Sequence, residues 1–157
     1  MPVGAFGGKA DIMSHVAPEG PVYQAGTLSA NPIALSAGMA SIELLLYDGF
    51  YDKLEEKTQQ FVSQILDHTK SKGYTFNIQQ IGSIFWLAFA DSRITRADQI
   101  DPSSMDLFRQ LHKRLLERGV YLGPSGYEVG FVSSAHSSES LDFAAKQICE
   151  VLDEILN

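Results

Sequence analysis

Residues 74–90 read YTFNIQQIGSIFWLAFA, and this stretch decides the fold of the region around it. Its first half alternates apolar and polar residues, with Tyr74, Phe76 and Ile78 on one side. That period of two predicts a strand over 74–79 with one face in water. Beyond Gly82 the residues at 83–90 are apolar on both faces, which predicts a central strand.

Helical patterns surround these two strands. Residues 50–72 repeat apolar side chains along one stripe, and a second amphipathic segment runs from 103 to 118. A last helix is expected after Ser137, a residue type that caps free amides. Short strands are expected at 120–122 and 131–133. The order of elements predicts an α+β fold in which a mostly antiparallel sheet is packed with helices.

The N-terminal region has a different character. A glycine-rich apolar strand is expected at 3–8, followed by a long loop at 16–29. Asn31 and Pro32 then open a helix over 33–47 that is apolar nearly all round, and such a helix needs neighbours on every side. If it is exposed, we expect it to drive self-association of the chain.

Composition excludes several classes of protein. The 157 residues are 45% apolar and carry 12 basic against 19 acidic side chains, for a net charge of −7. This acidic balance argues against nucleic-acid partners and anionic membranes, which need clustered Lys and Arg. The longest apolar runs are far shorter than the roughly 18 residues of a membrane span. Cys149 is the only cysteine, and no signal peptide is recognisable at the start, so a cytoplasmic location is expected.

Few residues suggest chemistry by their spacing. The four histidines form no pair with metal-ligand spacing, so no metal site is expected. Ser125 and His136 lack the spacing of a hydrolase nucleophile elbow, and nucleotide-binding glycine motifs are absent. Gly26 and Thr27 lie just ahead of a helix start, where backbone amides, a hydroxyl and the helix dipole suit a phosphate. A plain helix cap explains the same pattern. Glu128, in a loop with glycines and aromatic residues, is a second candidate, although a solvated loop glutamate is the simpler interpretation.

Three longer strings carry a family resemblance. They are PVGAFGG at 2–8, GPVYQAGTLSANP at 20–32, and GVYLGPS at 119–125 with EVGFVS at 128–133 and AH at 135–136. Together they resemble the glutamate-1-semialdehyde 2,1-aminomutases, which are class III aminotransferases that use pyridoxal phosphate. The Gly-Thr…Asn-Pro element is shared across the wider aminotransferase group. The resemblance extends over essentially the whole chain.

The resemblance implies a fold and an activity. The chain looks like the C-terminal part of a fold type I pyridoxal-phosphate enzyme: 1–48 would be the tail of the large domain and 49–157 the small domain. The reaction would convert glutamate 1-semialdehyde, an amino-acid aldehyde, into 5-aminolevulinate for tetrapyrrole synthesis, within a homodimer. The family's Schiff-base lysine lies upstream of the first string, so no catalytic residue is assigned to this chain, and the chain alone is expected to be inactive.

Binding roles follow at the positions that match. Gly26 and Thr27 match residues that bind the cofactor phosphate of the other subunit, and Tyr23 matches a tyrosine near the cofactor. Glu128 matches a glutamate that lines the substrate pocket. Ala30 departs from the family's usual glycine, which leaves the phosphate geometry open. Two alternatives remain: a fragment of another class III aminotransferase, or a non-catalytic interaction domain.

Overall fold

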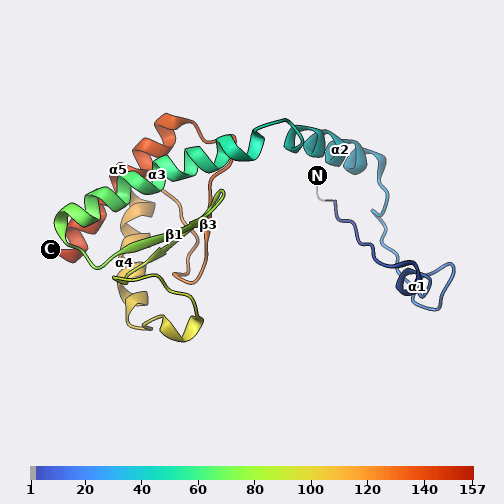
Figure 1. Ribbon diagram of the computed structural model, residues 1–157, viewed down its shortest axis with the longest axis horizontal. Helices are drawn as coiled ribbons and strands as arrows, with labels where there is room; N and C mark the ends of the chain where they lie inside the picture. The colour runs from blue at the N-terminus through green and yellow to red at the C-terminus, as the bar shows by residue number, and fades with distance from the viewer. Residues whose placement is uncertain (1–2) are drawn as a thin grey trace. The chain divides into compact units, whose positions relative to one another are not determined.

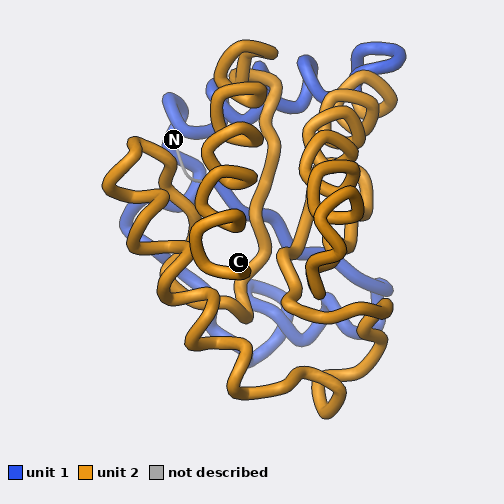
Figure 2. Tube along the Cα trace, turned by 90° about the vertical axis from the view of Figure 1, so that its left-hand side faces the viewer, with its two compact units in different colours: residues 1–50 blue, residues 51–157 orange. Residues whose placement is uncertain are grey.

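The structure is a computed structural model that describes residues 3–157. The chain divides into two compact units, residues 1–50 and residues 51–157 (Figure 2). The two units are described separately below. Their assignment to a large-domain tail and a small domain stays a prediction.

A three-stranded antiparallel sheet forms the centre of the second unit. Its order is β1 (Asn77–Ile81), β2 (Ile84–Ala88) and β3 (Gly130–Phe131), with β2 in the middle. Ile81 faces Ile84 across a two-residue turn, and Gly82 has a φ of +53°, a left-handed value that glycine adopts easily. The predicted pair of strands is confirmed, but the first begins at Asn77 because Tyr74 to Phe76 leave the end of the preceding helix in a turn.

Three helices cover this sheet, as Figure 1 shows. They are α3 (Phe50–Lys72), α4 (Ser104–Glu117) and α5 (Ser138–Leu156), and a short 3-10 turn, η1 (Ala97–Gln99), precedes α4. α5 lies between the other two, since Gln64 of α3 donates to Asp142 at 2.7 Å and Arg114 of α4 donates to Glu154 at 2.7 Å. The α+β fold predicted from the element order is therefore confirmed.

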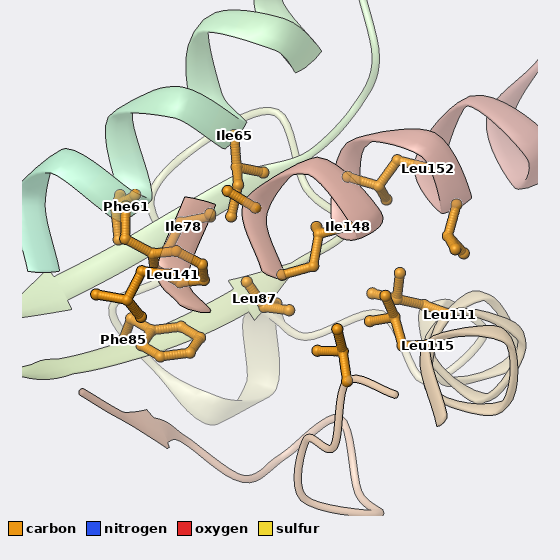
Figure 3. Packing of buried hydrophobic residues seen from close by; sticks show 14 of the residues in the cluster. Phe61, Ile65, Ile78, Phe85, Leu87, Leu111, Leu115, Leu141, Ile148 and Leu152 are labelled. Carbon is orange, nitrogen blue, oxygen red and sulfur yellow. The ribbon is translucent and has the colours of Figure 1, made fainter. Parts of the chain in front are cut away.

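The hydrophobic core lies between the helices and the sheet. Figure 3 shows side chains from all three helices and from β1 and β2 meeting there. Its fully buried members include Ile65, Leu111, Leu115, Ile148 and Leu152. Burial of such side chains stabilises a fold by about 1.5–3 kcal/mol each, so this core is the main source of stability in the second unit.

Two of the predicted strands do not form. Val120 to Leu122 has no strand partner among the described residues, because the Val120 amide instead donates to Leu115 O at 2.9 Å and closes the end of α4. Residues 3–8 are also irregular. The pairing in the first unit is a single bridge between Val16 and Val22 within the described residues, and a strand without a partner leaves its amides unpaired.

The first unit contains α1 (Ala10–Met13) and α2 (Pro32–Leu45). α2 begins where the sequence predicts, since the Asn31 side chain accepts hydrogen bonds from the amides of Ile33 and Ala34, each at 3.1 Å. Only Ala34 and Gly38 of this helix are buried. Its larger apolar side chains are exposed: Ile33, Leu35, Met39, Ile42, Leu44 and Leu45.

The helices of the described residues were compared with the length and hydropathy that a bilayer span needs. No single helix is both long enough and apolar enough to cross a bilayer, although α2 and α3 as a bent pair pass by length and composition alone.

Candidate functional site

The Gly26–Ser29 turn is the first part of the candidate site. The Ser29 amide donates to Gly26 O at 2.9 Å, and the Asn31 amide donates to Leu28 O at 3.1 Å, so the backbone is folded into two successive turns. Gly26 and Thr27 are both exposed. No hydrogen bond within residues 3–157 uses the amides of Thr27 and Leu28 or the Thr27 hydroxyl. The turn therefore presents several donors of the kind that hold a phosphate.

The first turn of α2 does not contribute such donors. Pro32 has no amide hydrogen, Asn31 Oδ1 accepts from Ile33 and Ala34, and the Leu35 amide donates to Asn31 O at 2.9 Å. The cap predicted at Asn31 therefore already occupies the first amides of this helix. A phosphate at this point would be held by the Gly26–Ser29 turn, with the helix dipole adding a longer-range attraction.

Ala30 joins this turn to α2 in an unusual conformation. Its φ is +57°, within the left-handed region, and it is the only non-glycine residue of the described chain with a positive φ. A Cβ atom makes this region unfavourable by about 1–2 kcal/mol, whereas glycine adopts it freely. Position 30, where the resemblance predicts glycine, thus has a backbone conformation that favours glycine.

Tyr23 lies three residues before Gly26 and is 84% exposed. It follows the bridge between Val16 and Val22, in a segment without regular structure. Tyr23, Gly26 and Thr27 thus belong to one exposed segment of the first unit, and Glu128 belongs to the second unit.

Glu128 lies in the loop 123–129, which leads into β3 and which we call the Glu128 loop. Its amide donates to Ser125 O at 3.0 Å, and the Tyr127 amide donates to Ser125 Oγ at 3.3 Å, so the tip is a hydrogen-bonded turn. The Glu128 side chain is exposed, and its carboxylate lies against Gly123. An exposed carboxylate held over a glycine can accept hydrogen bonds from an amine on a bound molecule.

Sequence reasoning missed Trp86, which touches this loop from the sheet. Its indole Nε1–H donates to Gly126 O at 2.8 Å, across 40 residues of sequence. No local pattern marks such a contact, because the central strand β2 is apolar throughout and Trp86 fits that pattern like its neighbours.

Other chemistry finds little support in the described residues. Ser125 and His136 serve separate local turns: His136 Nδ1 accepts from the Ser133 amide at 2.9 Å, and Ser125 Oγ accepts from Tyr127. Burial, with the nearby charge of Asp153, raises the pKa of the Cys149 thiol to about 11, so at neutral pH it is not a thiolate nucleophile. No cluster of three or more His, Cys, Asp or Glu side chains suited to a metal was found in the part of the chain that the structure describes.

Solved structures share this fold. A transaminase with PLP bound superimposes with a TM-score of 0.75 at 23% identity, over 95% of this chain and 34% of that one. A glutamate-1-semialdehyde aminomutase variant from Pseudomonas aeruginosa PAO1, in complex with PMP, gives a TM-score of 0.72 at 20% identity, over 84% of this chain and 29% of that one. At these identities the likeness concerns the fold, that of pyridoxal-phosphate-dependent aminotransferases.

Sequence comparison is more specific. The chain is 44% identical over 141 residues to the glutamate-1-semialdehyde 2,1-aminomutase of Bordetella avium (strain 197N). The aligned region covers 90% of this chain and 33% of that protein. The chain thus spans about a third of the length of this relative, and the predicted resemblance is confirmed. The family model "Aminotransferase class-III" matches residues 1–156. The chain therefore belongs to the class III aminotransferases.

Proposed function

We propose that this chain is part of an enzyme that converts glutamate 1-semialdehyde into 5-aminolevulinate by moving an amino group within one molecule. The observation that carries the proposal is the 44% identity to an aminomutase along 90% of the chain. The product is a precursor of tetrapyrroles, and an acidic chain with a single cysteine suits a reducing, cytoplasmic compartment. The whole enzyme would be a homodimer without nucleic-acid or membrane partners.

The Gly26–Ser29 turn supports a role in holding the cofactor phosphate. Its donors are the amides of Thr27 and Leu28 and the Thr27 hydroxyl, a set that suits phosphate oxygens and leaves the helix cap intact. In the dimer, Gly26 and Thr27 would bind the phosphate of the cofactor held by the second subunit, and Tyr23 would lie near it. Pyridoxal phosphate bound there supplies the electron sink for amine transfer.

Glu128 would meet the amino group of the substrate. An ionised carboxylate only accepts hydrogen bonds, so it would bind the ammonium or amine of the substrate and not the phosphate oxygens of the cofactor.

The 157-residue chain alone is expected to be inactive. Lys9, the lysine of the first unit, matches a basic position after the paired glycines rather than the family's Schiff-base lysine. Turnover of glutamate 1-semialdehyde by the purified chain with added pyridoxamine phosphate would overturn this statement.

The proposal is tested on the full-length enzyme that contains this chain. Loaded with pyridoxamine phosphate and given glutamate 1-semialdehyde without a second substrate, it should form 5-aminolevulinate in many turnovers. Turnover that requires a keto-acid acceptor would instead identify another class III aminotransferase. A protein that is inactive in both assays but binds a defined partner would be an interaction domain.

A further inference from the structure

The Glu128 loop is tied to the centre of the sheet by one side chain. Trp86 lies on β2, the middle strand, and its indole Nε1–H donates to the carbonyl of Gly126 at 2.8 Å. This bond is partly buried, and a carbonyl that loses such a donor is left without compensation for its lost hydration. The middle strand of the sheet therefore holds the tip of the loop.

Gly126 is buried where it receives this bond. A Cβ atom at this position would come within 2.7 Å of Met105 Sδ and 2.9 Å of Phe108 Cγ, both from α4. The loop backbone thus lies directly on α4 on one side and is held by Trp86 on the other. Two independent contacts fix the position of residue 126.

The constraint passes to Glu128 through a short path. One residue, Tyr127, separates Gly126 from Glu128, and the Glu128 amide closes the turn on Ser125 O at 3.0 Å. At the other end of the loop Gly123 leaves room for the carboxylate, because a Cβ there would overlap the Glu128 side chain. A displaced Gly126 would therefore move the Glu128 carboxylate as well.

We propose that Trp86 is a positioning residue that holds the Glu128 carboxylate in place for the substrate amine through its hydrogen bond to Gly126. The inference rests on the proposed function for the substrate role of Glu128, whereas the anchoring of the loop stands by itself. Preorganisation of this kind lowers the cost of ordering a loop when the substrate binds.

The anchoring is tested on the 157-residue chain by amide hydrogen exchange. Trp86→Phe keeps an aromatic ring and removes the N–H, so the Glu128 amide should exchange about two- to tenfold faster, the range expected for one net hydrogen bond. Tyr74→Phe removes the hydroxyl that donates to Asp153 and Asn157 at the C-terminal end of α5, outside the loop, and should leave this exchange unchanged. Gly126→Ala, which forces the loop away from α4, should also accelerate it.

The link to function is tested by a double-mutant cycle in the full-length enzyme with glutamate 1-semialdehyde. Trp86→Phe should raise KM about two- to tenfold with a smaller change in kcat. In a Glu128→Gln background the same substitution should have almost no further effect, because the group that it positions has already lost its charge. Tyr74→Phe should leave KM unchanged in both backgrounds.

The outcomes separate the two statements. Unchanged exchange at Glu128 in Trp86→Phe would overturn the anchoring by Trp86, whereas faster exchange in Gly126→Ala, which acts through α4, shows that the measurement detects a displaced loop. Equal effects of Trp86→Phe with and without Glu128→Gln would overturn positioning through Glu128. An enzyme whose KM and kcat are indifferent to Glu128→Gln would overturn the substrate role of Glu128, and positioning with it, while the exchange data still decide whether Trp86 holds the loop.

Discussion

At the scale of single residues, Ala30 combines a side chain with a backbone conformation that disfavours it. Its φ of +57° is the left-handed value, directly before the cap of α2. Ala30→Gly should remove about 1–2 kcal/mol of backbone strain. Part of this stabilisation is offset because glycine has more conformational entropy in the unfolded chain. We expect a net local gain of about 0.5–1 kcal/mol.

Hydrogen exchange of the Leu35 amide, which donates to Asn31 O at the start of α2, tests the prediction for Ala30→Gly. Exchange should slow about two- to fivefold in Ala30→Gly, the rate equivalent of that gain. Ala40→Gly, at an exposed position inside the same helix, is the matched control and should accelerate exchange. Faster exchange in Ala30→Gly would show that the Ala30 methyl group stabilises the turn by more than its strain.

Substitution of Thr27 tests whether the Gly26–Ser29 turn binds the cofactor phosphate. Thr27→Ala removes one hydroxyl donor from the Gly26–Ser29 turn, and hydrogen bonds to charged groups contribute about 1.5–3 kcal/mol. The full-length enzyme should therefore bind pyridoxamine phosphate about ten- to a hundredfold more weakly in an equilibrium titration. Thr27→Ser keeps the hydroxyl and should restore most of the affinity. Equal affinity of Thr27→Ala and the unaltered enzyme would remove the hydroxyl from the site.

Residue types predict their own local roles well, and their distant contacts poorly. Asn31 and Ser137 act as helix caps as their types suggest, because a cap bonds to amides two or three residues away. The sequence contains no comparable signal for the bond from Trp86 to Gly126, or for the φ of Ala30. Both depend on how segments far apart in the sequence come together, or on the exact path of a turn.

At the scale of elements, one carboxylate joins α3 to α5. His68 Nε2 lies 2.9 Å from Asp153 Oδ1, and the Tyr74 hydroxyl donates to the same oxygen at 2.9 Å. The hydrogen bond to His68, with a further one from Tyr74, lowers the pKa of Asp153. A folded carboxylate with a lowered pKa stabilises the protein above its unfolded pKa of about 3.9, and this stability is lost as the pH falls through the lower folded value.

Asp153→Asn should therefore lower the free energy of unfolding at neutral pH and reduce its dependence on pH in acid. Urea denaturation between about pH 2 and pH 6 should show the two proteins converging as the pH falls below about 4. Asp67→Asn changes an exposed carboxylate of α3 and should leave the curve almost unaltered. If the free energies of unfolding of the unaltered protein and Asp153→Asn differ by the same amount at every pH, the ionised form of Asp153 contributes nothing to stability.

Strands were harder to predict than helices for a physical reason. α3, α4 and α5 follow from apolar stripes and terminal signals that each segment carries itself. A strand exists only with a neighbour, so the strand predicted at 74–79 forms beside β2 as Asn77–Ile81, while those predicted at 3–8 and 120–122 do not form. Their sequences favour extended backbone, but not the partner that a ladder requires.

At the scale of the whole chain, the hydrophobic core belongs to one unit. Every buried member of the core cluster lies between Phe61 and Leu152, whereas the buried apolar side chain described in the first unit is Ala34. A fragment of residues 49–157 should therefore unfold cooperatively by calorimetry, within about 4 °C of the full chain, a shift equivalent to less than 1 kcal/mol. Residues 1–48 alone should show no cooperative transition. A fragment 49–157 that fails to fold would contradict this division of stability.

The same comparison tests the exposed apolar surface of α2. We expect the 157-residue chain to associate in sedimentation at high concentration and to bind a hydrophobic dye, because Ile33, Met39, Ile42 and Leu44 are more than half exposed. The fragment 49–157 should do neither to the same extent. A full chain that stays monomeric and binds no dye would contradict the expectation.

Trp86 is also an intrinsic fluorescent probe of the Glu128 loop. It is the only tryptophan among the 157 residues, so the intrinsic fluorescence of the protein comes chiefly from one indole, and that indole is bonded to the Glu128 loop. The emission spectrum is sensitive to the polarity and hydrogen bonding of the indole. A ligand that moves the loop away from β2 would therefore shift the wavelength of maximum emission. Stopped-flow fluorescence would then follow the loop motion in real time without an attached label.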